Sequence, residues 1–267
     1  MAHSEKFQSN LSRIIKVDDA SPLGDTKDFR PRLWSSKQQL FNLLKIESPI
    51  SDSDNLNDYQ HIKYKSDQKI CASGDMYNNL FVVYSGFLKT SWSDMNGNEK
   101  ILSFPMRGDV IGLDGIGRNE YQNDVVAISD VELIIIPNKK INQYENDDIL
   151  LQSKLLHILC NELINSQKIE YIIGALPAEA RVAKFLLSLG QKYHQLGFSG
   201  KSFNLRMTRN DIGSYLGLTL ETVSRTLSEF NKVGLVTVDQ KYICINDTER
   251  LKQLRRITPV RKKLIDN

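Results

Sequence analysis

Three side chains near the carboxyl end of this chain have types and spacing suited to contacting the edges of base pairs. Glu221, Ser224 and Arg225 lie three and four residues apart, which places them on one face of a helix. The forked guanidinium of Arg225 matches the O6 and N7 acceptors of guanine, and a glutamate can accept from a cytosine amino group. An ordinary surface helix also carries Glu and Arg four residues apart as a salt pair. The neighbouring elements must decide between the two interpretations.

The residues around this face predict two short helices joined by a tight turn. Thr208 and Asp211 have the spacing of a capping box at the start of the first helix. Gly217 suits a turn that needs positive φ, and Thr219 can cap the second helix, which ends near Gly234. Together these features predict a helix-turn-helix whose second helix enters the major groove of double-stranded DNA.

Each exposed side chain of this motif can be given an expected role. Glu221, Ser224 and Arg225 are expected at base edges, and the methyl groups of Leu220 are suited to thymine methyls. Other side chains are suited to phosphates, which set the register of the protein on DNA rather than its sequence preference. These phosphate candidates are Thr208, Arg209, Thr219 and Thr222.

The flanking residues predict that the motif belongs to a winged helix-turn-helix domain, residues 177–250. Residues 178–194 have an amphipathic helical pattern, and Gly213 is small where the two helices of the motif must touch. Two short apolar runs, 235–238 and 242–245, enclose a polar turn and predict a two-stranded wing.

Residues 49–146 have a different pattern and predict an all-β roll. Short apolar runs recur between turns punctuated by glycine, as in a roll or barrel. Asn96-Gly97 between two runs predicts a hairpin whose two turn residues both have positive φ. The runs are 80–84, 87–92, 101–104, 125–128 and 131–136.

A long helical pattern, residues 147–176, follows the roll and is ended by Pro177. One stripe of this helix is mostly apolar, which predicts a coiled-coil contact in a homodimer. The alternative is that the stripe packs only on the roll of its own chain. The stripe consists of Leu151, Leu155, Ile158, Leu159, Glu162, Asn165, Ile169 and Ile172.

The net charge of +3 conceals a difference between the two parts of the chain. Residues 178–267 contain 16 Lys and Arg against 8 Asp and Glu, whereas residues 1–177 contain 19 against 24. A basic C-terminal part beside an acidic remainder indicates that only the C-terminal part approaches a polyanion. The alternative for residues 251–267 is a basic tail that is merely solvated.

The N-terminal 48 residues lack sustained periodicity and predict a flexible arm, with a short helix near residues 37–45. No apolar run approaches the roughly 20 residues that span a bilayer. The N-terminus also lacks the apolar core of a signal peptide. We therefore expect a cytoplasmic protein with no membrane association.

Residues that could hold a metal or perform catalysis are sparse. Cys71, Cys160 and Cys244 are dispersed, and the four histidines are scattered, so neither set has metal-ligand spacing. The sequence contains no Gly-rich phosphate loop and no nucleophile elbow. We therefore predict no metal site, no catalytic residues and no enzymatic activity. A redox role for Cys71 or Cys160 remains an alternative to inert packing.

Residues from about Pro49 to Leu254 resemble the CRP/FNR family of bacterial transcription regulators, in particular the fumarate–nitrate-reduction branch. The segments that carry the resemblance are MTRNDIGSYLGLTLETVSR (207–225), GDVIGLDGIG (108–117) and LPAEARVAKFL (176–186). The resemblance implies an α+β chain with a roll of the cyclic-nucleotide-binding type, a dimerisation helix and a C-terminal winged helix-turn-helix. It also implies a dimeric regulator, expected to act as an activator, that contacts RNA polymerase through surface loops such as Asp94–Lys100.

Within the family, the residues at the reading positions imply a palindrome of TTGAT-like half-sites, read by Glu221, Ser224 and Arg225. The cyclic-AMP receptor branch has arginine where this chain has Leu220, which disfavours a TGTGA-type half-site. The target genes and the sign of regulation do not follow from the sequence.

The chain departs from the family's known sensors. Residues 1–70 contain no cysteine, and Ile134 stands where oxygen-sensing members have a cluster ligand, so no iron–sulfur cluster is expected. Tyr121–Val125 has no arginine to face a phosphate, which disfavours a cyclic nucleotide. We therefore predict no cofactor, and the signal stays open. An alternative function is a ligand-binding regulatory subunit that acts on a protein partner through its roll.

Overall fold

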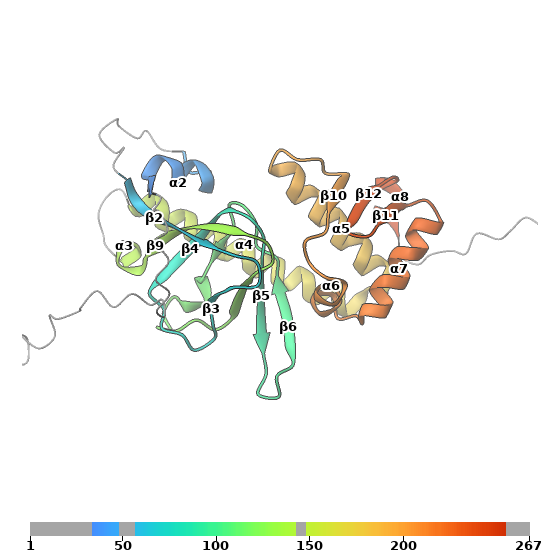
Figure 1. The fold of residues 1–267 in the computed structure, drawn as a ribbon, viewed down its shortest axis with the longest axis horizontal. Coiled ribbons are helices and arrows are strands. Elements are labelled where there is room, and N and C mark those ends of the chain that lie inside the picture. The colour runs from blue at the N-terminus through green and yellow to red at the C-terminus, as the bar shows by residue number, and fades with distance from the viewer. Residues whose placement is uncertain (1–33, 48–56, 143–147, 255–267) are drawn as a thin grey trace, which may run out of the picture. The chain divides into compact units, whose positions relative to one another are not determined.

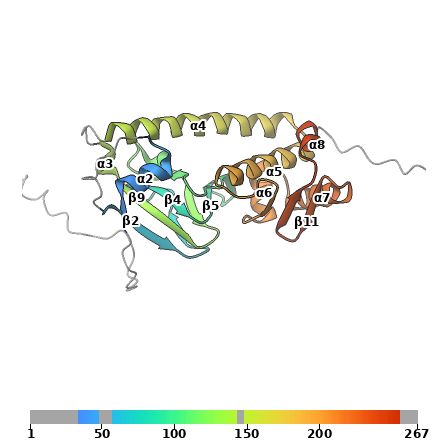
Figure 2. The same cartoon turned by 90° about the horizontal axis from the view of Figure 1, so that it is seen from above.

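The computed structural model describes residues 34–47, 57–142 and 148–254 (Figures 1 and 2). An antiparallel sheet has the strand order β1-β2-β9-β4-β7, and a second has the order β3-β8-β5-β6. The strands of the first sheet are β1 Trp34–Ser36, β2 Asn57–Tyr64, β9 Val131–Pro137, β4 Asn79–Ser85 and β7 Val110–Ile111. Those of the second are β3 Lys69–Cys71, β8 Asp124–Ala127, β5 Leu88–Ser93 and β6 Glu99–Ser103. The predicted α+β class and the roll are confirmed.

The core of the roll lies around the paired strands β4 and β9. Leu80 pairs with Ile136 and Val82 with Ile134 in an antiparallel register, and all four side chains are buried. Burying a side chain of this size stabilises the fold by about 1.5–3 kcal/mol. Ile134, which the family resemblance aligns with a cluster ligand, is therefore part of the hydrophobic core.

The predicted N-terminal arm contains ordered structure from Trp34 onward. Strand β1 pairs with β2, and helix α2 (Lys37–Leu44) begins with a capping box formed by Ser36 and Gln39. Leu40 and Phe41 of α2 are buried in the core of the roll. The short helix predicted near residues 37–45 is thus confirmed, but it belongs to the roll. Residues 1–33 lie outside the described residues.

The hairpin between β5 and β6 is confirmed, but its turn differs from the predicted two-residue turn. Five residues, 94–98, join the strands, and φ is positive at Gly97 but not at Asn96. Asp94 accounts for the difference, because its carboxylate accepts hydrogen bonds from the backbone N–H groups of Asn96 (2.8 Å) and Asn98 (2.9 Å). This side chain closes a wider loop than the Asn-Gly pair alone would form.

The long helix α4 (Asp148–Ala175) follows the short helix α3 (Asn138–Asn142) and is seen side-on in Figure 2. The stripe predicted as a dimer seam does not all face outward. Leu151 and Leu155 are buried in the core of the roll, and Ile158 packs against that core. For this half of the helix the alternative of packing on the chain's own roll is correct, because these side chains complete the hydrophobic core.

The C-terminal part, here called the head (residues 178–254), has its own sheet of order β10-β12-β11. Its elements are α5 Ala178–Gln195, β10 Ser202–Asn204, α6 Arg209–Leu216, α7 Leu220–Lys232, β11 Val236–Asp239, β12 Tyr242–Ile245 and α8 Thr248–Gln253. The predicted helices and wing are confirmed. Helix α8 is an addition: Asp247 caps it and Leu251, within the predicted basic tail, is buried in the head. Residues 255–267 lie outside the described residues.

Among all described residues, no helix combines the length and the apolar character that crossing a bilayer requires.

Candidate nucleic-acid interface

Local hydrogen bonds set the geometry of the motif formed by α6 and α7. The capping box is confirmed: the Asp211 N–H donates to the Thr208 hydroxyl (3.0 Å), and the Thr208 N–H donates to the Asp211 carboxylate (2.9 Å). Gly217 ends α6 with φ of 63°, the left-handed conformation predicted for the turn. Gly213 is required by a close approach, because a Cβ there would lie 2.7 Å from the carbonyl oxygen of Leu218.

Helix α7 presents one face to the core and the opposite face to solvent. Thr219 caps the helix by accepting from the Thr222 N–H (3.2 Å), as predicted. The buried face consists of Val223, Thr226, Leu227 and Phe230. The opposite face presents the predicted base-contacting side chains: Leu220, Glu221 and Arg225 are exposed, and Ser224 is half-buried.

The salt-pair interpretation of Glu221 and Arg225 can be tested directly. Among the ion pairs of the described residues, none joins these two side chains. The carboxylate and the guanidinium are therefore both available to a ligand on the open face of α7. We refer to Leu220, Glu221, Ser224 and Arg225 as the reading face.

The four residues predicted to contact phosphates differ in their hydrogen-bond partners within the protein. The Thr219 and Thr222 hydroxyls lie 3.1 Å apart at the start of α7. The Thr208 hydroxyl donates to Asp211 (2.7 Å) within the capping box. Arg209 lies against the wing, where its Nη2 donates to the Gln240 carbonyl (2.9 Å) while Nη1 is buried without a partner. Burial lowers the pKa of Arg209.

Residues that the sequence did not single out hold the motif from outside. The Arg181 guanidinium of α5 donates to the carbonyls of Leu216 (3.1 Å) and Gly217 (3.3 Å) at the end of α6. These carbonyls carry the negative end of the helix dipole, where a cation is stabilising. Arg181 lies 35 residues from Leu216, so helical spacing gave no signal of this role.

The stretch Tyr121–Val125 is where the family resemblance would place the residues that face a small anion. The Asp114 carboxylate already accepts from the Gln122 N–H (2.8 Å) and the Asn123 side-chain amide (3.0 Å). The Tyr77 ring packs against Gly115, and its hydroxyl is buried without a partner. This stretch is thus hydrogen-bonded to an internal negative charge.

Two observations bear on metal binding and catalysis. Within the described parts of the chain, no group of three or more His, Cys, Asp or Glu side chains could hold a metal ion. Ser35, His61 and Glu132 form a hydrogen-bonded chain, with 2.7 Å between His61 Nδ1 and the Glu132 carboxylate. Ser35 is only 1% exposed, so this chain fastens β1 to the roll and presents no nucleophile to solvent.

Comparisons with known proteins support both parts of the structure. A model described as a Crp-like helix-turn-helix domain matches residues 180–254, and a cyclic nucleotide-binding domain matches residues 61–148. The chain is 34% identical over 226 residues to the Anaerobic regulatory protein of Pasteurella multocida, covering 85% of this chain and 78% of that protein. It is 31% identical over 216 residues to the Fumarate and nitrate reduction regulatory protein of Escherichia coli K12, covering 81% of each.

A solved structure agrees with these relatives. FixK2 from Bradyrhizobium japonicum superposes with a TM-score of 0.68 at 26% identity, covering 75% of this chain and 98% of FixK2. The helix-turn-helix, the roll and the relatives all indicate a DNA-binding regulator rather than an enzyme. The chain belongs to the CRP/FNR family of transcription regulators.

Proposed function

We propose that this regulator acts as a homodimer on a palindromic site with TTGAT-like half-sites, one reading face per half-site. The observation that carries the proposal is the open face of α7, where Glu221, Ser224 and Arg225 lie together without an ion pair between the two charges. Arg225 would donate to guanine and Glu221 would accept from a base amino group. The cytoplasmic location predicted from the sequence fits a protein that acts on chromosomal DNA.

A second copy of the chain is the partner that best fits the exposed side of α4. Leu156, Leu163 and Tyr171 are spaced seven and eight residues apart and are 60%, 62% and 65% exposed. Ile149, seven residues before Leu156, is also exposed. Apolar side chains repeated at this spacing form the seam of a two-stranded coiled coil. The proposed dimer seam is therefore this stripe, Ile149, Leu156, Leu163 and Tyr171, rather than the stripe predicted from the sequence.

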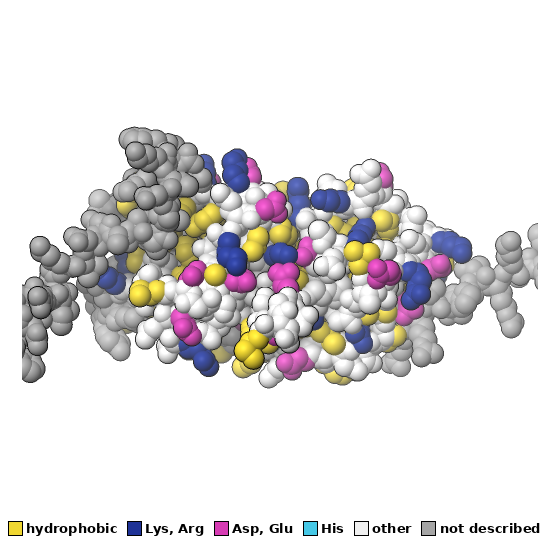
Figure 3. Space-filling view, turned by 60° about the horizontal axis from the view of Figure 1, so that its bottom comes forward, with side chains coloured by type: hydrophobic (Ala, Val, Ile, Leu, Met, Phe, Trp, Pro, Cys, Tyr) yellow, Lys and Arg dark blue, Asp and Glu magenta, His cyan; other side chains and the backbone are white. Residues whose placement is uncertain are grey.

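RNA polymerase is the proposed partner of the loop between β5 and β6. Met95 at its tip is fully exposed and Trp92 beside it is half-exposed. On the face drawn in Figure 3, hydrophobic side chains reach the surface among charges of both signs. Hydrogen bonds from Asn98 and Asn96 hold the loop and lower the pKa of Asp94. A fixed loop with exposed apolar side chains is typical of a protein-binding surface.

We also propose that the roll responds to something other than a cyclic nucleotide or an iron–sulfur cluster. A phosphate bound near Gln122 would lie close to the Asp114 carboxylate, which accepts a hydrogen bond from the Gln122 N–H. The two negative charges would repel each other. A cluster bound by thiolates needs about four ligands, whereas Cys71 is the cysteine of the roll.

Fluorescence anisotropy with labelled duplexes tests the proposed function. The duplexes carry two TTGAT-like half-sites, one half-site, or a scrambled sequence, and each titration is repeated over a range of salt concentrations. We expect the strongest binding to the two-half-site duplex, with affinity that falls steeply as salt rises because bound counterions are released. Equal affinity for all three duplexes would refute sequence-specific reading. Absence of binding to any of the three duplexes would favour the alternative, a regulatory subunit that acts on a protein partner through its roll.

A further inference from the structure

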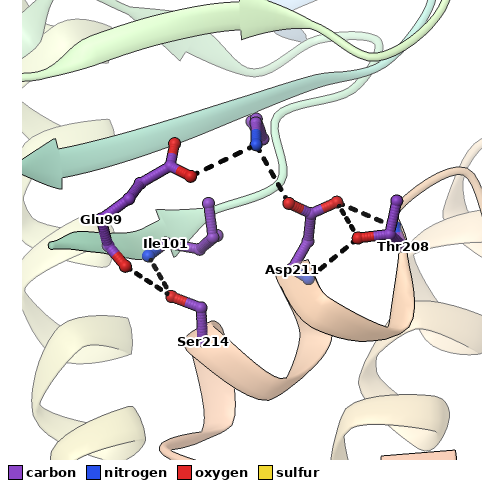
Figure 4. Close-up of polar contacts among 6 residues, drawn as sticks. Glu99, Ile101, Thr208, Asp211 and Ser214 are labelled. Atoms are coloured by element: carbon purple, nitrogen blue, oxygen red, sulfur yellow. Dashed lines mark hydrogen bonds and ion pairs between the residues drawn. The ribbon is translucent and has the colours of Figure 1, made fainter. Parts of the chain in front are cut away.

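Helix α6 of the motif is attached directly to the edge of a sheet in the roll (Figure 4). Strand β6 is the last strand of the order β3-β8-β5-β6, so one side of its backbone has no neighbouring strand. The Ser214 hydroxyl occupies part of that side: it accepts from the Ile101 N–H (2.9 Å) and donates to the Glu99 carbonyl (3.2 Å). One side chain of α6 thus satisfies two backbone groups of β6, as a neighbouring strand would.

A partly buried ion pair joins the first turn of α6 to strand β5. The Lys89 ammonium donates to the Asp211 carboxylate (3.0 Å), and their side chains are 20% and 10% exposed. Burial opposes the charge on each, but the hydrogen bonds and opposite charges outweigh it, so the pKa of Lys89 is raised and that of Asp211 is lowered. Shielding from water makes such a pair stronger than an exposed one.

A second lysine of the roll holds the other end of α6. The Lys100 ammonium donates to the carbonyl oxygens of Ser214 and, at 3.2 Å, of Tyr215. Burial and the nearby Arg181 charge lower the pKa of Lys100, so keeping this ammonium charged at the contact costs desolvation. A cation at the C-terminal end of α6 is favoured by the helix dipole.

Apolar packing continues the same contact. Phe104, which follows β6, packs edge-on against Phe185 (centroids 6.0 Å apart) and Tyr215 (5.4 Å) of the head. Ile101 lies in the same hydrophobic cluster as the core of the head. The contact therefore has a hydrophobic interior as well as three polar attachments.

We propose that Lys89, Lys100, Asp211 and Ser214, here called the α6 clamp, fix the orientation of the head on the roll and that high-affinity binding to two half-sites depends on this. The proposal rests on the proposed function. The clamp holds α6 and leaves the reading face of α7 open, so it positions that face rather than covering it. The four side chains act as positioning residues and do not contact DNA themselves.

Fixed orientation matters because two heads must engage one duplex. Once the first head is bound, the second binds as an intramolecular event whose effective concentration depends on the correct geometry. A head released from its roll would sample many orientations, and the effective concentration of the second head at its half-site would fall. Binding of a single head to a single half-site involves no such alignment and should change little.

The test compares three variants with the wild-type protein in full-length form. Lys89→Met with Lys100→Met removes both charges and keeps the apolar stems, and Ser214→Ala removes the β6 attachment without changing any charge. Lys65→Met is the matched control, because Lys65 pairs with Asp130 (2.6 Å) on the exposed surface of the roll. Anisotropy gives the affinity for two-half-site and one-half-site duplexes. In the double lysine variant, hydrogen exchange at the Ile101 amide reports whether the clamp has opened. In Ser214→Ala it reports the loss of the amide's own acceptor, so the affinities decide for that variant.

We expect faster exchange at Ile101 in both clamp variants, with at least about a tenfold loss of affinity for two half-sites. Affinity for one half-site should stay within about twofold, and Lys65→Met should match the wild type. Faster exchange with unchanged or increased two-half-site affinity would overturn the proposal. If the double lysine variant loses its helical structure, Ser214→Ala decides by its affinities for the two-half-site and one-half-site duplexes. A wild-type protein that does not distinguish the duplexes would refute the proposed function, and the clamp proposal with it.

Discussion

At the scale of single residues, Arg225 is the side chain whose loss should be most informative. Its guanidinium lies exposed on the reading face and is not paired with Glu221. We expect Arg225→Ala to cost about 1–3 kcal/mol and to relax preference at one base pair. Titrations with duplexes substituted at each position of the half-site measure this effect.

The control for that variant is Lys232→Ala, which removes an equal charge from the last turn of the same helix. It should leave the order of preferred bases unchanged. If Arg225→Ala retained the wild-type preference at every position, the assignment of Arg225 to a base edge would be wrong.

The cysteines differ in ways that predict their reactivity. Cys71 is 5% exposed, and burial beside Asp114 raises its pKa to about 12, so almost no thiolate exists near neutral pH. Cys160 is exposed on α4. Because the thiolate is the reactive form, we expect iodoacetamide at about pH 8 to leave Cys71 unmodified until the protein is unfolded. Cys160 lies one helical turn from Leu156 and Leu163, so it should be shielded in the proposed dimer and modified in a monomeric variant such as Leu163→Glu. Mass spectrometry of digested protein checks this, and rapid native alkylation of Cys71 would reopen a redox role for it.

At the scale of elements, the contact between α6 and the turn depends on Gly213. A Cβ there would lie 2.7 Å from the Leu218 carbonyl, so the two helices of the motif would have to separate. We expect Gly213→Ala to destabilise the head by about 1–3 kcal/mol, despite the better helix propensity of alanine. Thermal unfolding followed by circular dichroism measures the change.

Gly174 of α4 provides the matched control, because a Cβ there would meet nothing within 4 Å. Gly174→Ala should be neutral or stabilise the helix by up to about 1 kcal/mol. Equal melting temperatures for the two variants would show that the close approach at Gly213 is easily relieved.

The elements that could be predicted from sequence are those specified by nearby residues. The cap at Thr208, the turn at Gly217 and the apolar positions of α7 all lie within one short stretch, and the structure agrees with them. The turn at Asn96-Gly97 was predicted wrongly because the Asp94 side chain competes for the same backbone groups. Helix α8 was missed because a single cap and one buried leucine give little periodic signal.

At the scale of the whole molecule, the side of α4 that faces outward could not be read from its sequence. The helix has apolar residues on two sides, and only the position of the roll shows that Leu151 and Leu155 are covered while Leu156 and Leu163 are open. The α6 clamp could not be predicted from the sequence either, because Lys89 and Asp211 are 122 residues apart in the chain. Helical or strand periodicity carries no information about such contacts.

The proposed dimer predicts a specific effect of charge in its seam. Leu163→Glu would bury a carboxylate opposite its own copy, and the cost of desolvating two like charges should make the protein monomeric. Asn165→Glu is the control, since helical geometry turns residue 165 by about 200° from residue 163, to the other side of α4. Sedimentation velocity distinguishes the two outcomes. A Leu163→Glu protein that stays dimeric would place the seam elsewhere.

The attachment of Ser214 to the edge of β6 also protects that edge of the roll from other chains. Without residues 178–254, the Ile101 N–H and the Glu99 carbonyl would lose their cap and leave a vacant strand position. Vacant positions of this kind recruit strands from other molecules. We therefore expect a truncated roll to self-associate through β6, which rising light scattering would reveal. In the whole chain, the head covers this strand edge and so prevents the roll from aggregating.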